Sequence, residues 1–380
     1  MKIAMIIDSW KPFWAGGQIH VWELCQGLVK NHDCKIDLFV MNLKGNNGGQ
    51  KETYFNDKLN IYYVGKVAEF NFLPRIKWCY DLIKFVKKKN KKEKYDIIHS
   101  HANLAGFPGK ILNKKLGLPI TYTVHGCGLE VIKEMYGNNI KSKILYFLEN
   151  FLQTKIKYDL EITVDKSFLK YNNFNKKIEV IPNGVDIKKF DSIESNKSDK
   201  FKIIFVGRLH PQKGLTYLLD ALELIKTELK NVEVHIIGGG ELERILKEKT
   251  EKLGLSDIVR FRGKIYGDNL IKEYKSSNLF VLPSLYEGQP LTLLEAWGAK
   301  LPVLVTDVGG NKDFVIEEKN GYIVNPKDIN GLAQTLLKAI KNLTLSQFGE
   351  EGYYLVKNNY TWDDMVEKTK SMYENILNKI

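Results

Sequence analysis

Residues 287–295 read Glu-Gly-Gln-Pro-Leu-Thr-Leu-Leu-Glu, and this stretch decides how the fold is interpreted. It separates two carboxylates by a Gly-Gln-Pro turn and the start of an apolar helix. Pro290 suits a helix start, because an N–H group there would have no partner inside the helix. We therefore expect Glu287 in the loop before the helix and Glu295 about one turn inside it. The free amides of the first turn and the positive end of the helix dipole favour a bound phosphate.

The flanking residues make this stretch more informative than an isolated pair of glutamates, which would more often be a helix cap and a solvated side chain. Residues 278–284, Asn-Leu-Phe-Val-Leu-Pro-Ser, predict a buried strand that ends in a turn. Residues 301–310, Leu-Pro-Val-Leu-Val-Thr-Asp-Val-Gly-Gly, predict another that ends in a glycine pair. The whole block closely resembles the donor-sugar signature of the retaining glycosyltransferases of family 4. The resemblance implies an α/β enzyme with the GT-B fold, in which two Rossmann-like doubly wound parallel-sheet domains face a cleft.

The 380 residues are enough for about two domains. Predicted strands alternate with helices throughout, which is typical of parallel α/β sheets. A polar stretch, residues 191–200, is interpreted as the interdomain linker, and the alternation restarts at the strand 201–206. We place an acceptor-side domain at 1–182 and a nucleotide-sugar domain at 183–359. Apolar residues of the last segment form one helical stripe, and the resemblance implies that this helix, 360–380, packs back on the first domain.

Composition indicates the cellular compartment of the protein. No apolar run approaches the roughly 18 residues of a membrane span, and the N-terminal segment 2–8 is too short for a signal-peptide core. The four cysteines are scattered, which favours a reducing compartment and suggests neither a disulfide framework nor a zinc site. We expect a cytoplasmic protein, with peripheral attachment to the inner face of the cell membrane left open.

The net charge of +12 is partly local, because segment 75–94 carries nine basic and two acidic residues among several aromatic and aliphatic ones. One interpretation is a helix with a solvated basic face. The other is docking on an anionic membrane surface, which each well-placed Lys or Arg favours by about 1 kcal/mol. The sequence does not separate the two. Nucleic acid is not expected as a partner, because no nucleic-acid-binding motif accompanies the charge.

A basic pair follows the first strand of the second predicted domain. Residues 207–214 read Gly-Arg-Leu-His-Pro-Gln-Lys-Gly, so Arg208 and Lys213 lie at the carboxyl end of that strand. Open α/β sheets bind anionic ligands at such edges. Arg208 can chelate a phosphate with its planar fork, and Lys213 supplies a point charge. In family 4 the matching residues neutralise the departing diphosphate, whereas an isolated pair with this spacing would more often be solvated.

Histidines end two strands of the first predicted domain. His125, in Val-His-Gly, matches the histidine that family 4 enzymes place over the donor sugar, although a structural role is an alternative. His101 is a candidate for lining the same cleft, and His99 is interpreted as structural. Glu130 is a weaker candidate for acceptor contact.

The remaining candidates lie in loops after strands and in the first turns of helices. The resemblance assigns sugar hydroxyls to Glu287 and ribose hydroxyls to Glu295. The candidate catalytic residues are His125, Arg208, Lys213 and Glu287. The candidate substrate contacts are Gly16, Gly17, His101, Glu130, Gly207, Gly239, Arg262, Gly288, Leu291, Thr292, Leu293 and Glu295. Family members often have Gly-Asp-Gly around position 239, where this chain has three glycines, so no aspartate contact is expected there.

The expected reaction moves a sugar from a nucleotide-diphosphate sugar to a hydroxyl acceptor, which is a glycolipid, a polysaccharide or a small sugar. No Asp-x-Asp motif is present, so we expect neither a metal ion nor another cofactor. Three alternatives stay open: a GT-B nucleotide-sugar epimerase, a glycoside hydrolase that uses the two glutamates as acid and base, and a non-catalytic basic binding module. The sequence does not identify the sugar, the base or the acceptor.

Overall fold

The computed structural model describes residues 1–12, 14–44, 51–69, 72–102, 104–126, 129, 132, 140–171, 175 and 178–378. The chain divides into two compact units. Unit 1 contains the described residues up to Asn183 together with the C-terminal helix α14 (Trp362–Leu377), and unit 2 contains Gly184–Thr361. Residues 191–200, predicted to be an interdomain linker, lie inside unit 2, so that prediction is wrong. Tyr353 holds this segment to the unit by hydrogen bonds to Asp191.

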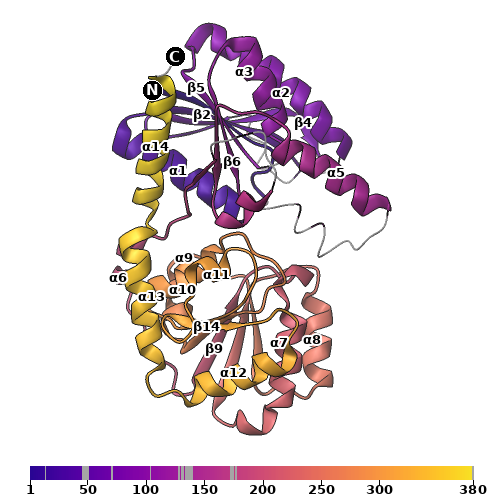
Figure 1. The fold of residues 1–380 in the computed structure, drawn as a ribbon, viewed down its shortest axis with the longest axis vertical. Helices are drawn as coiled ribbons and strands as arrows, with labels where there is room; N and C mark the ends of the chain where they lie inside the picture. Colours follow the sequence, from indigo (N-terminus) through magenta and orange to yellow (C-terminus); the bar gives the residue numbers. More distant parts are fainter. Residues whose placement is uncertain are drawn as a thin grey trace. The chain divides into compact units, whose positions relative to one another are not determined.

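Unit 1 is built on an eight-stranded sheet with the order β3-β4-β2-β1-β5-β6-β7-β8 (Figure 1). Neighbouring strands are parallel except for β3, which runs antiparallel to β4. The strands are β1 Lys2–Ile7, β2 Lys35–Leu43, β3 Lys51–Tyr54, β4 Leu59–Ala68, β5 Ile97–His101, β6 Ile120–Val124, β7 Leu160–Thr163 and β8 Ile178–Val180. Central strands are buried along nearly their whole length, as expected for a parallel sheet covered by helices on both faces.

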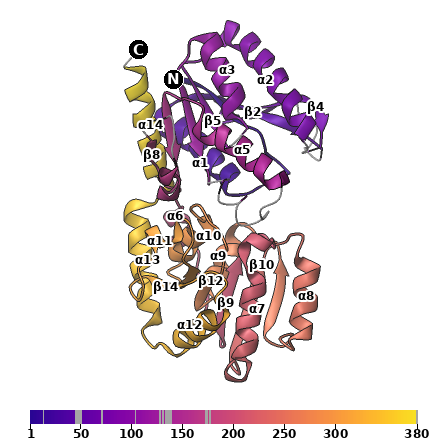
Figure 2. The same cartoon turned by 45° about the vertical axis from the view of Figure 1, so that its right-hand side comes forward.

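Helices cover the two faces of this sheet in a pattern set by the strand order. The helices are α1 Gly16–His32, α2 Phe72–Glu93, α3 Gly106–Leu116 and α5 Ile140–Thr154, with a short 3₁₀ helix η1 at Lys166–Lys170. The connection from β1 to β2 moves one way along the sheet, whereas the connections from β4 to β5, from β5 to β6 and from β6 to β7 move the other way. Because such crossovers are right-handed, α1 lies on one face of the sheet and α2, α3 and α5 lie on the other (Figure 2).

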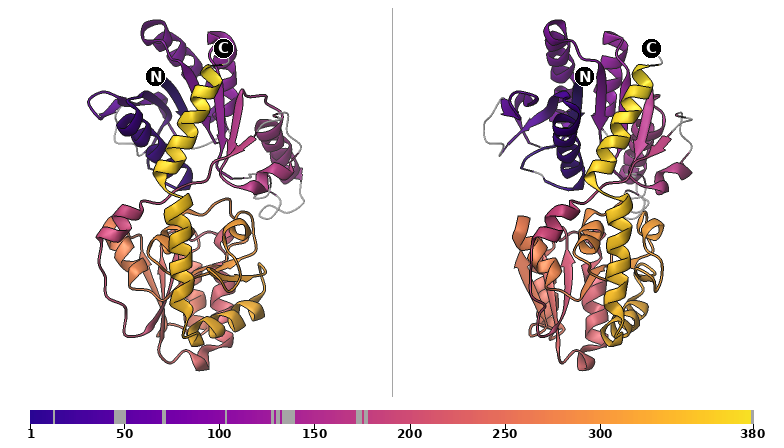
Figure 3. Two further views of the ribbon diagram at one scale, coloured as in Figure 1. Left: turned by 60° about the vertical axis from the view of Figure 1, so that its left-hand side comes forward. Right: turned by 90° about the vertical axis from the view of Figure 1, so that its left-hand side faces the viewer.

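The last helix of the chain completes the α1 side of unit 1. α14 packs against α1, where a Cβ atom on Gly27 would lie 2.4 Å from Val366 Cγ2 (Figure 3). Met365, Val366 and Tyr373 belong to the same buried cluster as the apolar residues of β1 and α1. Residues some 340 positions apart in sequence therefore share one core.

Unit 2 contains a six-stranded parallel sheet with the order β11-β10-β9-β12-β13-β14. Its strands are β9 Phe201–Val206, β10 Val232–Ile237, β11 Val259–Gly263, β12 Leu279–Leu282, β13 Val303–Thr306 and β14 Gly321–Val324. Its helices are α6 Ile187–Ser192, α7 Leu215–Leu224, α8 Glu243–Lys252, α9 Gly267–Lys275, α10 Leu291–Gly298, α11 Asn311–Phe314, α12 Ile329–Lys341 and α13 Leu345–Asn359, with 3₁₀ turns η2 Pro211–Lys213 and η3 Lys226–Glu228. The strand order reverses direction between β9 and β12, and such a switch point opens a ligand crevice at the carboxyl ends of the strands.

Candidate active site

The loops after β9 and β12 meet at the switch point of unit 2. Gly214 has a φ angle of +66°, and a Cβ atom there would lie 1.9 Å from the carbonyl oxygen of Pro283. Only glycine fits this approach, so the loop that carries the basic pair packs directly on the loop that leads to Glu287. Arg208 is exposed at this edge. Lys213 occupies the end of η2 and is largely buried.

An ion pair joins the two loops. Lys213 Nζ lies 2.5 Å from Glu287 Oε1, and the hydroxyl of Ser284 donates to the same oxygen at 2.5 Å. The side chains of Lys213 and Glu287 are only 15% and 7% exposed. The structure therefore brings together two residues that the sequence analysis had assigned separately, one to the diphosphate and one to the sugar. Ser284 was missed there, although its position three residues before Glu287 forms a Ser-x-x-Glu pattern.

A second glycine fixes the loop that contains Glu287. Gly309 follows β13 with a φ angle of +50°, and a Cβ atom there would lie 1.6 Å from the carbonyl oxygen of Glu287. The next amide, that of Gly310, donates to the oxygen of Gly288 at 3.0 Å. The glycine pair predicted after β13 thus supports the Glu287 loop from the other side.

Helix α10 begins at Leu291 with Pro290 as its N-cap residue, as the sequence predicts. Leu291 and Thr292 belong to the first turn, whose N–H groups have no partner within a helix. The N–H of Leu293, by contrast, donates to the oxygen of Pro290 at 3.1 Å. Leu293 therefore does not offer a free amide to a phosphate, and the candidate anion site rests on the two residues before it.

Glu295 lies one turn further along α10 and is half-buried. The hydroxyl of Tyr274, on α9, donates to Glu295 Oε2 at 2.9 Å. Burial raises the pKa of the Glu295 carboxyl, and the hydrogen bond from Tyr274 opposes that rise. A ribose hydroxyl that donated a hydrogen bond to this carboxylate would meet a group already oriented by the Tyr274 hydroxyl. Nothing in the sequence pattern pointed to Tyr274.

The loops after β9, β10 and β11 are joined to one another through their backbones. Gly238 has a φ angle of +139°, and a Cβ atom there would lie 1.8 Å from the oxygen of Gly207. The amide of Leu209 donates to the oxygen of Gly239 at 3.1 Å, so Gly207 and Gly239 line adjoining loops at the predicted edge. Arg262, at the end of β11, is exposed and forms an ion pair with Glu273 at 3.2 Å.

The candidates of unit 1 gather at the carboxyl ends of β5 and β6. His101 Nδ1 lies 3.2 Å from His125 Nε2, and the two rings are nearly parallel. His20, on α1, packs edge-on against His125 with ring centroids 4.6 Å apart, and its Nδ1 lies 2.8 Å from Asn183 Oδ1. Gly17 sits against the His125 ring, where an added Cβ atom would lie 3.5 Å from Cγ. The Gly16-Gly17 turn and the two strand-end histidines therefore form one cluster.

Burial governs the protonation of this cluster. It lowers the pKa of His20 to about 4, although the hydrogen bond to Asn183 acts in the opposite direction. Burial first, and neighbouring histidines second, hold the pKa values of His101 and His125 well below their usual range. The imidazoles are thus neutral at pH 7. His20, missed in the sequence analysis, lies three residues after Gly17 and hence on the same side of α1.

Ligand nitrogens of His20, His101 and His125 lie within 4.8 Å of one another, which makes them the group most suited to a metal ion among the described residues. The hydrogen bond between His101 and His125 and the hydrogen bond between His20 and Asn183 account for this arrangement without a metal ion. Both ring nitrogens of His99 are used in hydrogen bonds to the hydroxyls of Tyr373 and Thr123, which fits the structural role expected for it. Glu130 lies outside the described residues.

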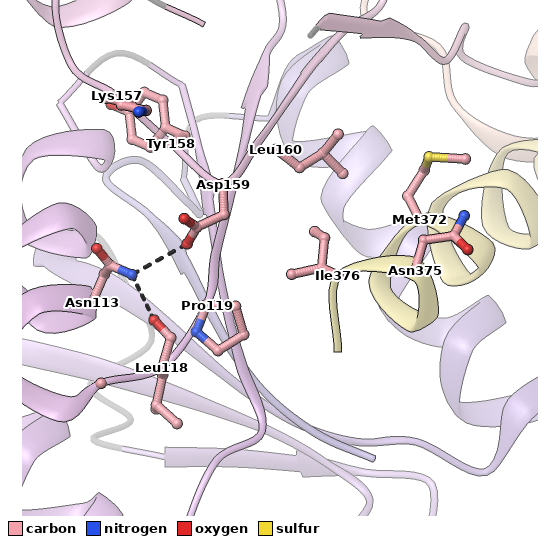
Figure 4. Close-up of a pocket in the computed structure, with 11 residues that line it drawn as sticks. Asn113, Leu118, Pro119, Lys157, Tyr158, Asp159, Leu160, Met372, Asn375 and Ile376 are labelled. Atoms are coloured by element: carbon pink, nitrogen blue, oxygen red, sulfur yellow. Dashed lines mark hydrogen bonds between the residues drawn. The ribbon is translucent and has the colours of Figure 1, made fainter. Parts of the chain in front are cut away.

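A separate hollow of about 510 Å³ lies at the opposite edge of the unit 1 sheet (Figure 4). It is lined by residues at the amino ends of β6 and β7 and by Met372, Asn375 and Ile376 of α14. Asp159 holds its wall together by accepting hydrogen bonds from Asn113 and from the amide of Ile120. None of the sequence-predicted site residues reaches it.

Two family profiles match consecutive parts of the chain. The profile "Glycosyltransferase Family 4" covers residues 14–189, and "Glycosyl transferases group 1" covers residues 186–355. An uncharacterized glycosyltransferase of Methanocaldococcus jannaschii is 31% identical over 98% of both chains. The chain is a family 4 glycosyltransferase. The predicted resemblance is thereby confirmed, and with it an enzyme that transfers sugars from nucleotide sugars.

Other relatives of this glycosyltransferase act on different substrates. The UDP-Gal:alpha-D-GlcNAc-diphosphoundecaprenol alpha-1,3-galactosyltransferase of Escherichia coli is 30% identical, with 90% of each chain covered. Mannosylfructose-phosphate synthase of Agrobacterium fabrum is 24% identical over 80% of this chain. The names of these two relatives therefore specify different products.

Solved structures confirm the GT-B fold class. Sucrose-phosphate synthase from Thermosynechococcus elongatus superposes with a TM-score of 0.87 at 20% identity, and each chain is covered completely. HepE of Anabaena in complex with UDP-glucose gives a TM-score of 0.74 at 17% identity, with 99% of this chain covered. Among the residues that the structure describes, no helix has both the length and the apolar character needed to cross a bilayer.

Proposed function

We propose that this glycosyltransferase moves a sugar from a UDP-sugar to a sugar hydroxyl of a lipid-linked acceptor, with retention of configuration and without a metal ion. The observation that carries the proposal is the ion pair between Lys213 and Glu287, which joins the two loops at the switch point of unit 2. It sets a cation, a carboxylate and the start of α10 along one edge of one sheet. These are the groups that a sugar diphosphate requires.

Arg208 and Lys213 stabilise the negative charge that grows on the diphosphate as the bond to the sugar breaks. The first-turn amides of α10, at Leu291 and Thr292, add partial positive charge to the same group. Fixed charges of this kind act without reorganisation during the reaction and commonly supply a large part of catalysis. A divalent cation is unnecessary where protein groups already neutralise the leaving group.

Glu287 orients the donor sugar through its hydroxyls, and Lys213 and Ser284 hold the carboxylate in place. Glu295 binds the ribose, with Tyr274 fixing its orientation. In unit 1, His125 contacts the donor sugar as a neutral imidazole that His101 and His20 position. The acceptor oxygen bonds to the anomeric carbon on the face that the diphosphate leaves, and the departing diphosphate takes the acceptor proton.

The choice of UDP and of a lipid-linked acceptor rests on the E. coli galactosyltransferase, whose name specifies both and which matches 90% of this chain. The test is a thermal-shift screen with UDP-, GDP- and ADP-sugars, followed by transfer to a diphosphoundecaprenol-linked sugar. We expect stabilisation by UDP-sugars and a product whose anomeric proton coupling shows retention. Release of free sugar without transfer would instead indicate a hydrolase, and an epimerised nucleotide sugar would indicate an isomerase.

A further inference from the structure

Helix α5 exposes the side that most surface helices bury. Its apolar residues Ile140, Ile144, Phe147 and Phe151 recur every three or four positions and form one stripe. They are 79%, 56%, 69% and 47% exposed. The side chains that α5 buries include polar ones, namely Ser142, Gln153 and Thr154. This distribution is the reverse of an ordinary amphipathic helix on a globular core.

Helix α2 carries a second exposed stripe of mixed character. Leu73, Ile76 and Tyr80 occupy its first half, and Lys84, Lys88 and Lys91 continue the same side of the helix to its end. The ammonium group of Lys84 lies 4.2 Å from the ring centre of Tyr80, which joins the apolar and basic halves. The stripe thus changes from apolar to cationic along the helix.

These two stripes belong to one face of unit 1. Right-handed crossovers place α2, α3 and α5 on the same side of the sheet, and α2 packs against α3 (Figures 1 and 2). Between them, α3 adds the exposed side chains of Phe107, Lys114 and Lys115. We call the outward surface of these three helices the α2–α3–α5 face.

We propose that the α2–α3–α5 face docks on a bilayer that contains anionic lipids, with the apolar stripe of α5 entering the headgroup–acyl boundary. An exposed apolar stripe flanked by lysines is the arrangement of helices that lie in a membrane interface. The lysines of α2 and α3 contact the anionic headgroups, which attract each such charge. The sequence analysis considered segment 75–94 alone, whereas the structure adds α5 as the inserting element.

Charge selects the bilayer over a second copy of this chain as the occupant. Two copies joined through this face would bring the exposed lysines Lys84, Lys88, Lys91, Lys114 and Lys115 of one copy near those of the other. Like charges brought together in this way disfavour association. An anionic bilayer instead complements the lysines and also accepts the apolar stripe, so it satisfies both features at once.

The test is flotation of the full chain with vesicles of phosphatidylcholine alone or with phosphatidylglycerol added. The wild type should float with the anionic vesicles only. Phe147→Ser combined with Phe151→Ser should weaken this binding on the order of tenfold or more, because the apolar contribution is lost. Lys84→Gln, Lys88→Gln and Lys91→Gln should each weaken it about fivefold at low salt. The binding that remains after the lysine changes should be less sensitive to salt than that of the wild type, because Lys114 and Lys115 of α3 still contact the headgroups.

A matched control changes two exposed apolar residues of unit 2, Ile245→Ser and Leu343→Ser, which are 47% and 100% exposed. This control should float as the wild type does. Equal flotation of the Phe147/Phe151 variant and the wild type would overturn the proposal, as would equal binding to neutral vesicles. Light scattering after gel filtration provides a further check, since a dimer that the Phe147/Phe151 change dissociates would assign the face to a second copy.

Donor binding in solution separates this proposal from the proposed function. All variants of the α2–α3–α5 face should keep the wild-type thermal shift with a UDP-sugar, because the changed side chains are exposed and none of them is a candidate donor residue. A variant that loses flotation but keeps the thermal shift is impaired in membrane docking and not in donor binding. An absent thermal shift in the wild type would refute the donor assignment and leave the flotation result unaffected.

Discussion

Replacement of Lys213 by alanine tests the candidate site most directly, because this residue has both a structural and a proposed chemical role. The change removes a charged hydrogen bond to a carboxylate whose side chain is 7% exposed. Hydrogen bonds to charged groups contribute about 1.5–3 kcal/mol, and the remaining bond from Ser284 limits the damage to Glu287. We therefore expect the free energy of unfolding of unit 2 to fall by about 1–3 kcal/mol.

The expected loss of activity is separate from this loss of stability. If Lys213 stabilises the departing diphosphate, kcat should fall on the order of 10²–10³-fold, as when one oxyanion donor is removed. This corresponds to about 2.7–4 kcal/mol at the transition state. The donor KM should change less, because the diphosphate carries more charge as the bond breaks than in the ground state. Initial rates with a UDP-sugar and thermal unfolding measure the two effects.

A matched variant distinguishes a chemical role from a purely structural one. Lys202, at the start of β9, forms an ion pair with Glu273 at 2.7 Å, and the two side chains are 6% and 15% exposed. Lys202→Ala should lower stability as Lys213→Ala does, with no loss of kcat in the folded enzyme. The double variant Lys213→Ala/Glu287→Ala should regain part of the stability, because no carboxylate is left unpaired, but no activity. A near-wild-type kcat in Lys213→Ala would refute the assignment of the diphosphate site.

Arg208→Ala should lower kcat by a similar factor of about 10²–10³ but should leave thermal stability unchanged, since Arg208 is exposed; steady-state rates and a melting curve check both. Glu295→Gln should weaken donor binding in calorimetry and raise the melting temperature of the free enzyme at pH 8, because burial raises the pKa of the carboxyl and its charged form therefore costs stability at that pH. Glycosyl transfer should proceed fully in excess EDTA, and activity lost to the chelator and restored by Mg²⁺ or Mn²⁺ would contradict the proposed mechanism. The free energy of unfolding of unit 1 should fall as the pH drops from 6.5 toward 4, because buried His20 has a pKa of about 4 in the folded state and the unfolded chain takes up the proton first. Urea unfolding at several pH values should show a slope of about 1.4 kcal/mol per pH unit for each such histidine. The variant His20→Asn should reduce this slope.

Sequence patterns predicted the strands that are mostly apolar: the strand predicted at 201–206 has the bounds of β9, and the buried strands predicted within 278–284 and 301–310 are β12 and β13. β3, β4 and β14 were missed. β3 is polar and only partly buried, and β4 ends in exposed residues, so neither shows the continuous apolar run of a central strand. The wrong linker at 191–200 has a similar cause, since a polar composition does not reveal that Asp191 and Ser198 are held by Tyr353 and Glu233.

The candidate site was predictable where a residue's role follows from its place after a strand. Arg208, Lys213, Glu287 and His125 all lie where the sequence placed them, although their roles stay predictions. What the sequence did not contain were pairings between distant segments: Lys213 with Glu287, Tyr274 with Glu295, and His20 with Asn183. Each depends on how loops and helices pack, which no local spacing encodes. The occupied amide of Leu293 likewise depends on the path of the turn at Pro290.

The return of α14 to unit 1 sets an order for folding during synthesis. Unit 2 is complete once the ribosome has released residue 361, while unit 1 still lacks the helix that covers α1. The core of unit 1 can therefore close only after α14 has been translated. A stop codon between residues 361 and 373 would leave unit 2 intact but remove the hydroxyl that bonds His99, whose ring centroid lies 3.8 Å from that of His101 at an interplanar angle of 38°. Such a truncation should therefore disturb the histidine cluster.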